Sequence, residues 1–224
     1  MNTYLLPIYA VLFGYVVVWI TKERTIKNIK FLLAFSGAFL LSITVFELLP
    51  EVYSNLDAKA TGLFIMLGIL VQILLEFLSK GAEHGHMHIQ KNGKVFPWLL
   101  FISLCVHSFL EGFPIHEDND MVYGILVHKI PIAILVTTFL IQSGFKTVQI
   151  IGFLVLFAIM TPLGTILSHN ISFLTNYISY FNAIVIGIFL HISTTILFES
   201  SEGHKFNLMK VLVISLAIAC AYFI

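Results

Sequence analysis

Charge is scarce in this chain, and so are cysteine and proline. Of its 224 residues only 11% are charged, two are cysteine and six are proline. Soluble domains keep roughly a quarter of their residues charged, so a soluble globular protein is excluded. The 58% of residues that are hydrophobic need lipid to cover them. We therefore infer an integral membrane protein.

Several motifs are also missing. Cys105 and Cys220 lie inside apolar stretches and neither belongs to a CxxC pair, so we expect no disulfide framework and no thiolate zinc site. The chain has no GxxxxGK[ST] sequence, which argues against direct ATP drive, and no HExxH-type pair. The alternating pattern of barrel strands is absent as well, which leaves a bundle of helices as the structure that can cross the membrane.

The apolar residues gather in stretches long enough to cross a bilayer. A membrane-spanning helix needs about 20 mostly apolar residues. Eight such stretches follow one another along the chain: about 4–20, 31–50, 61–79, 96–115, 121–142, 149–168, 178–198 and 208–224. The predicted fold class is therefore all-α, a polytopic membrane protein of eight transmembrane helices that form a single domain over residues 1–224.

The basic residues predict the orientation of these stretches. Most lie in the loops after odd-numbered stretches: Lys22, Arg24, Lys27, Lys30, Lys80, Lys91, Lys94, Lys146, Lys205 and Lys210. Only Lys59 lies in an opposite loop. Because loops rich in Lys and Arg stay in the cytoplasm, we expect a multi-pass protein of the cell membrane with both termini outside. The loop 80–95, with His84, His86 and His88, then lies in the cytoplasm.

The second and seventh stretches resemble each other. The segment from Gly37 reads GAFLLSITVFELLPE, and the segment from Gly187 reads GIFLHISTTILFESSE. Because the two stretches cross in opposite directions, this predicts an inverted repeat, with stretches 1–3 and 6–8 around the central pair 4 and 5. Chance similarity between common residue types is the alternative.

The central pair carries ionisable residues deep in apolar surroundings. His107 and Glu111 are four residues apart, on one face of a helix, and His128 follows in the next stretch. A helical rise of about 1.5 Å per residue puts the two histidines about 12 and about 10 Å from the outer ends of their stretches. Two imidazoles and a carboxylate at one depth suit Zn²⁺, and also Fe²⁺ or Mn²⁺. The alternative is that all three are hydrogen-bonded packing residues.

Other polar residues are candidates for an accessory metal path. Lys129 either pairs with Glu111 or extends toward the membrane surface, and Ser108 lies beside His107. Glu47 lies near the end of the second stretch. His191 is either on the path or a packing residue. His84, His86 and His88 either receive the metal in the cytoplasm or bind it weakly.

The sequences HSFLEG and HKIP resemble the ZIP (Zrt/Irt-like) family of metal transporters. The matching residues are His107, Ser108, Glu111 and Gly112 in the fourth stretch, His128 and Lys129 in the fifth, and Pro50 and Glu51 at the end of the second. The eight spans, the outside termini and the histidine-bearing loop also match the family. This resemblance implies import of Zn²⁺, or a related ion such as Fe²⁺, Mn²⁺ or Cd²⁺, toward the cytoplasm by alternating access. It makes His107, Glu111 and His128 the metal ligands.

The chain departs from the family pattern at two positions. Ile132 stands where the family usually has a glutamate, and Glu47 stands where many members have a histidine. We therefore expect one metal position rather than two, with looser discrimination between metals.

We expect a transporter rather than an enzyme, with a divalent metal ion as substrate, the lipid bilayer as surroundings and no nucleic-acid partner. The alternatives are an intramembrane metal-dependent hydrolase and a membrane protein that binds or senses metal without moving it. A homodimer is left open.

Overall fold

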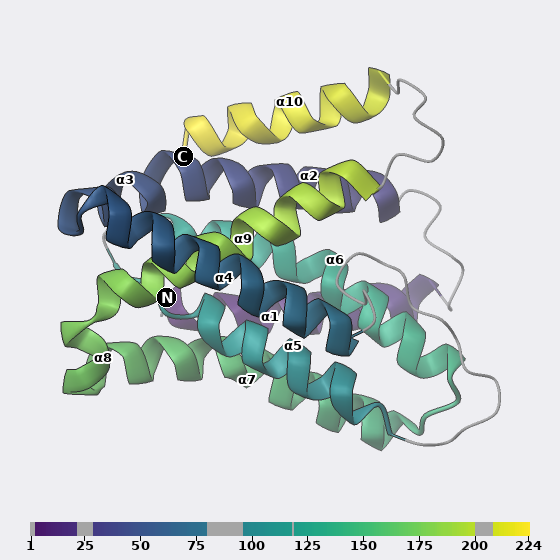
Figure 1. Cartoon of the computed structure of the whole chain (residues 1–224). Coiled ribbons are helices and arrows are strands. Elements are labelled where there is room, and N and C mark those ends of the chain that lie inside the picture. Colours follow the sequence, from purple (N-terminus) through teal and green to yellow (C-terminus); the bar gives the residue numbers. More distant parts are fainter. Residues whose placement is uncertain (1–2, 22–28, 80–95, 118, 200–207) are drawn as a thin grey trace.

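The computed structural model describes residues 3–21, 29–79, 96–117, 119–199 and 208–224. Every regular element within these ranges is a helix, and none of these residues forms a strand. Most of the long helices lie side by side in one bundle (Figure 1). Both termini lie toward the end of the bundle that also holds α3 and α8, which we call the terminal end.

The first half of the chain forms a short 3₁₀ turn and four helices. They are η1 (Thr3–Leu5), α1 (Leu6–Thr21), α2 (Ile29–Ile43), α3 (Leu49–Asn55) and α4 (Ala58–Ser79), and a π-helical segment, η2 (Thr44–Leu48), joins α2 to α3. The second half forms α5 (Trp98–Glu111), α6 (Met121–Gln142), α7 (Thr147–Asn170), α8 (Ser172–Asn176), α9 (Ile178–Glu199) and α10 (Leu208–Tyr222).

The prediction of an all-α membrane protein is confirmed, and each of the eight predicted stretches contains a helix. Among the described residues, five helical segments are long and apolar enough to cross a membrane: Ile29–Asn55, Ala58–Ser79, Met121–Gln142, Thr147–Asn170 and Ile178–Phe198. The helices α1, α5 and α10 are apolar but shorter, so the count of eight spans stays a prediction. Helix α5 ends at Glu111 rather than at the predicted residue 115. A turn that contains Gly112 and Pro114 begins directly after Glu111.

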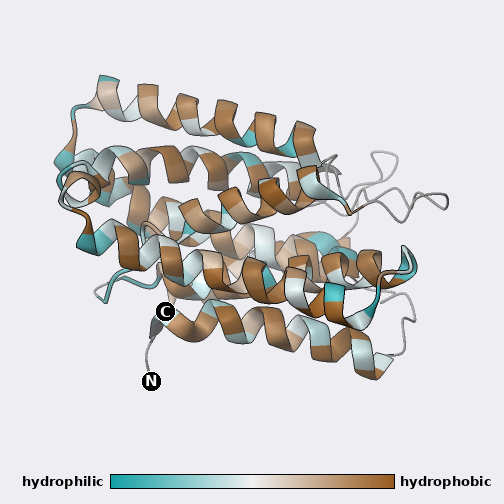
Figure 2. Ribbon diagram, turned by 90° about the horizontal axis from the view of Figure 1, so that it is seen from below, coloured by the Kyte–Doolittle hydropathy of each residue, from teal (hydrophilic) through white to brown (hydrophobic). Residues whose placement is uncertain are grey.

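Hydrophobic residues run along all the helices (Figure 2), so that many large apolar side chains are exposed on the outside, while the interior holds apolar residues together with small and polar ones. In α4 the buried residues include Thr61, Gly68 and Gln72, whereas Leu63 and Phe77 are 67% and 78% exposed. A soluble protein would not expose so much apolar surface. This arrangement is the one expected of a bundle surrounded by lipid, where small residues let helices approach closely.

The helices sort into two groups by their packing. In one group α1 packs on α6 and α7, and α5 packs on α7. In the other group α9 packs on α4 and α2, and α10 packs on α2, so that α10 and α7 lie at opposite sides of the molecule (Figure 1). We call these the site bundle (α1, α5, α6 and α7) and the outer bundle (α2, α4, α9 and α10).

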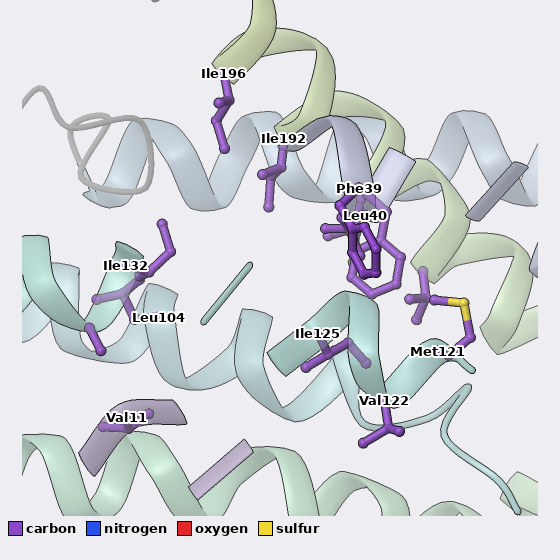
Figure 3. Packing of buried hydrophobic residues seen from close by; sticks show 14 of the residues in the cluster. Val11, Phe39, Leu40, Leu104, Met121, Val122, Ile125, Ile132, Ile192 and Ile196 are labelled. Atoms are coloured by element: carbon purple, nitrogen blue, oxygen red, sulfur yellow. The ribbon is translucent and has the colours of Figure 1, made fainter. Parts of the chain in front are cut away.

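The two bundles meet where α2 packs on α6 and α4 packs on α5. Figure 3 shows Phe39 and Leu40 of α2 next to Ile125 and Met121 of α6, and all four are at most 3% exposed. Gly124 lies at the same place: a Cβ there would be 3.3 Å from Leu40 Cδ1. The contact between the bundles is therefore an apolar surface of interlocking side chains.

Each bundle contains one crossing at which two glycines let the helix backbones touch. In the site bundle, a Cβ on Gly164 would lie 1.9 Å from the Phe109 carbonyl oxygen, and one on Gly112 would lie 2.2 Å from that of Thr161. In the outer bundle, a Cβ on Gly68 would lie 1.9 Å from the Ile184 carbonyl oxygen. Only glycine fits such positions.

Candidate metal site

A buried ion pair forms the centre of the candidate site. Glu111, the last residue of α5, and Lys129 of α6 are 1% and 2% exposed. The Lys129 ammonium donates hydrogen bonds to Glu111 Oε1 and Ser108 Oγ, and to Thr161 Oγ1 at 2.8 Å. It also lies 4.5 Å from the centroid of the Phe157 ring, which adds a cation–π contact. A charge this far from water needs such partners to be tolerated.

Two hydroxyls and an imidazole also contact the carboxylate of Glu111. Thr161 Oγ1 donates to Glu111 Oε1 at 2.7 Å, and Ser108 Oγ donates to the same oxygen at 3.2 Å. The second oxygen, Oε2, lies 3.4 Å from His107 Nε2. One oxygen of Glu111 therefore faces the ammonium and the hydroxyls, while the other faces an imidazole.

The structure brings the three predicted ligands into one neighbourhood. His107 and His128 are 4% and 2% exposed, and their ring centroids lie 6.2 Å apart with the rings inclined at 74°. His107 therefore lies near both Glu111 and His128. Within the described ranges, however, no three His, Cys, Asp or Glu side chains are arranged around one metal position. The role of these residues as metal ligands stays a prediction.

Packing of α5 on α7 places Glu111 and Ser108 within reach of Thr161. One turn later, Thr165 Oγ1 donates to the Gly112 carbonyl oxygen at 2.7 Å. The contact is possible because Gly112 and Gly164 carry no side chain at the crossing. Backbone packing between these two helices therefore sets the position of the carboxylate.

The candidate accessory residues lie in different parts of the chain. Ser108 and Lys129 lie beside Glu111, and Lys129 pairs with Glu111 rather than extending toward the membrane surface, while their part in a metal path stays a prediction. Glu47, in the π-helical segment, accepts a hydrogen bond from the backbone N–H of Asp120 at the start of α6. His191 lies in the other bundle, where its Nε2 is 2.7 Å from Glu76 Oε2. His84, His86 and His88 lie outside the described residues.

Sequence reasoning missed the contribution of α7. Phe157, Thr161 and Thr165 all contact residues of the site or of the turn after it. The pentapeptide TPLGT, residues 161–165, was the available signal, because its Pro162 and Gly164 mark an unusual place in a long apolar helix. The hydroxyls of its two threonines become informative only when α7 is known to face α5.

Comparisons with known proteins agree with the resemblance. Residues 78–224 match the model of the family described as ZIP zinc transporter. Two curated proteins, both named zinc transporter ZIP1, are similar over shorter regions. The one from Danio rerio is 31% identical over 93 residues, which cover 39% of this chain and 31% of the relative. The one from Takifugu rubripes is 29% identical over 89 residues, which cover 37% of this chain and 30% of the relative.

The matched regions thus span about a third of the length of these relatives. The family match is broader and includes the helices that carry His107, Glu111, His128 and Thr161. It groups the chain with transport proteins rather than with enzymes. The chain belongs to the ZIP family of zinc transporters.

Proposed function

We propose that this protein carries Zn²⁺ across the cell membrane toward the cytoplasm, and that His107, Glu111 and His128 are the ligands of the ion. The observation that carries the proposal is a carboxylate, 1% exposed, that lies next to an imidazole in the interior of a membrane bundle. Burying ionisable groups in such surroundings is costly and usually marks an ion pathway. Two imidazole nitrogens and one carboxylate oxygen are donors that Zn²⁺ prefers, and water can complete its shell.

Lys129 explains why one metal position is enough. Its ammonium already neutralises Glu111 Oε1 and occupies the side of the carboxylate that faces Ser108 and Thr161. A second cation there would meet the ammonium at close range, which is unfavourable. Ile132, 3% exposed one turn after His128, adds no donor. The free approach to Glu111 is the side of Oε2, toward the histidines.

The packing of the helices supports alternating access. The site bundle and the outer bundle meet in an apolar surface, whereas the contacts within each bundle include backbone-to-backbone glycine crossings. Two bodies held together internally by backbone contacts, and meeting each other through apolar side chains, are suited to rigid-body movement. In this proposal the site bundle moves against the outer bundle and exposes the ion first to one side and then to the other.

The same contacts support the inverted repeat. If stretches 1–3 correspond to stretches 6–8 and stretch 4 to stretch 5, the packing of α4 on α9 corresponds to that of α10 on α2. The packing of α1 on α6 likewise corresponds to that of α7 on α5. All four pairs are among the principal contacts between helices, as expected of a transporter built from two inverted halves.

The remaining features of the proposal come from the sequence. The distribution of Lys and Arg places both termini, and hence the terminal end of the bundle, outside. Import then ends at the cytoplasmic loop that carries His84, His86 and His88, with Glu47 and His191 as accessory residues. Apolar outer faces would contact lipid or, in a homodimer, a second copy of the chain, and the mass of the protein in nanodiscs distinguishes the two.

Metal uptake by proteoliposomes tests the function. We expect wild type to admit Zn²⁺, with Fe²⁺, Mn²⁺ and Cd²⁺ as competitors, and we expect Glu111→Ala, His107→Ala and His128→Ala to lose uptake by at least about tenfold, since each removes one donor. Glu117→Ala, at an exposed carboxylate of the α5–α6 connection, is the matched control.

The outcome separates the alternatives. Metal-dependent hydrolysis without uptake would favour the hydrolase, and tight Zn²⁺ binding without uptake would favour a binding or sensing protein. Uptake that survives all three substitutions would remove these residues from the transport path.

A further inference from the structure

The connection between α5 and α6, described at residues 112–117 and 119–120, lies toward the terminal end of the site bundle. It follows Glu111 directly and precedes the helix that carries His128. On one side it is attached to its own bundle: Thr165 Oγ1 donates to the Gly112 carbonyl at 2.7 Å, and His169 Nε2 lies 2.9 Å from the Ile115 carbonyl oxygen. The connection must therefore follow α7 when the site bundle moves.

On its other side the connection makes two polar contacts with η2 and α3, the segments that continue α2 of the outer bundle. His116 Nε2 lies 3.5 Å from Glu51 Oε2, and the backbone N–H of Asp120 donates to Glu47 Oε2 at 3.0 Å. Glu47 belongs to the π-helical segment Thr44–Leu48 and Glu51 to the helix that follows it. Single π-helical turns inside α-helices are often found at functional sites, and this one carries Glu47, the acceptor of the Asp120 contact.

An aromatic contact lies at the same end of the bundle. The ring centroids of Phe113, in the connection, and Phe181, in α9, are 5.4 Å apart, and Phe113 is 3% exposed. Phe113 also packs on Phe109 of α5, with centroids 5.2 Å apart. The two polar contacts thus accompany an aromatic contact that also joins the bundles.

The His116–Glu51 contact differs in exposure from the Thr165–Gly112 attachment to α7, whereas His169, which makes the other attachment to α7, is itself exposed. The side chains of His116 and Glu51 are 30% and 37% exposed, whereas Thr165 is 1% exposed. Water can replace a lost partner at an exposed contact, so breaking it costs little, whereas a buried carbonyl without a partner is costly. When the bundles separate at this end, the connection will part from Glu51 and Glu47 and stay with α7.

We propose that the His116–Glu51 and Asp120–Glu47 contacts form a latch that holds the terminal end of the bundle closed over the metal site, with Phe113 against Phe181 beneath it. Opening of this end requires the latch to break. The inference rests on the proposed movement of two bundles but not on Zn²⁺ being the transported ion.

Chemical labelling of a buried cysteine tests the latch without any measurement of transport. Met121 at the start of α6 is 0% exposed, and Cys105 and Cys220 are free thiols that Cys105→Ala and Cys220→Ala remove. In nanodiscs both faces of the protein are accessible, so a polar maleimide reports how often Met121→Cys becomes exposed. Ile115→Cys, at a residue 1% exposed, is a second reporter should the first variant fold poorly.

Weakening the latch should speed the labelling. We expect Glu51→Gln, His116→Gln and Glu47→Gln each to raise the rate about twofold to fivefold, because partly exposed polar contacts are individually weak. Glu117→Gln, which removes an exposed carboxylate from the same connection, should leave the rate unchanged. Equal labelling rates in all four variants would overturn the proposal. So would labelling of Met121→Cys as fast as that of a fully exposed thiol in a chain whose latch residues are unchanged.

A crosslink tests the same inference in the opposite direction. The double variant Glu51→Cys with His116→Cys is joined by a short bifunctional reagent that attaches to each thiol through a disulfide. This crosslink should stop Zn²⁺ uptake by proteoliposomes, and its reduction should restore uptake. Each single-cysteine variant treated in the same way is the control. Uptake that continues in fully crosslinked protein overturns the latch, whereas failure of wild type to take up any metal contradicts the proposed function and leaves the labelling result intact.

Discussion

The crossing of α5 with α7 and the crossing of α4 with α9 are built alike but differ in chemistry. Both rely on paired glycines, with Gly112 and Gly164 at the first and Gly68 and Gly187 at the second. Both also lie near a contact between a carboxylate and a basic side chain. The Glu111–Lys129 pair near the first is 1–2% exposed, whereas the Glu76–His191 pair at the second is 20–24% exposed.

This difference teaches that close helix packing alone does not make an ion site. At the α5–α7 crossing the approach of the backbones brings Thr161 to the carboxylate and closes the surroundings around it. At the α4–α9 crossing, the polar pair beyond the glycines stays partly exposed. Burial gives the first pair its electrostatic strength and makes it expensive to leave incomplete.

The largest effect should come from removing the ammonium of the buried pair. Lys129→Met leaves Glu111 charged and without its cation, which we expect to cost about 3–5 kcal/mol of stability. Thermal unfolding in detergent measures the loss. Adding Glu111→Gln in the same chain should recover most of it, because the buried charge then disappears as well. An unchanged unfolding temperature in Lys129→Met would mean that the pair contributes nothing to the fold.

A smaller effect should follow from filling the glycine crossings. Gly164→Ala and Gly68→Ala force a Cβ against a backbone carbonyl 1.9 Å away, and we expect each to cost about 1–3 kcal/mol. Gly152→Ala in α7 and Gly62→Ala in α4 are matched controls, since no atom lies within 4 Å of a Cβ at either position. Helix propensity favours alanine there, so these two should not destabilise. Equal unfolding temperatures for all four variants would contradict the crossings.

The smallest effect is expected at the partly exposed pair. Glu76→Gln removes the charge beside His191 but keeps a hydrogen-bonding group, and because the pair is partly exposed we expect a loss of about 1 kcal/mol or less. The same unfolding assay, read beside Lys129→Met, completes the comparison. A loss as large as that of Lys129→Met would show that exposure does not distinguish the two pairs.

Much of the site followed from local rules of the sequence. His107 and Glu111 had to share a face because residues four apart lie on the same side of a helix. In the structure His107 Nε2 lies 3.4 Å from Glu111 Oε2. The estimated depths correctly brought His128 near His107, with ring centroids 6.2 Å apart. The π-helical turn before Pro50 and the early end of α5 at Glu111 did not follow, because both depend on how the helices pack.

By itself, the sequence determined that the chain is a membrane protein, which residues form its helices and which ionisable residues these helices contain. The reason is that a bilayer accepts only apolar segments whose backbone groups are hydrogen-bonded within the protein. Only the tertiary structure decided that Lys129 turns to Glu111, that Thr161 completes their surroundings, and that His191 pairs with Glu76 instead of joining the site. These choices join residues from different helices. They are made where the helices meet, because there a buried charge takes whichever partner the packing brings within reach.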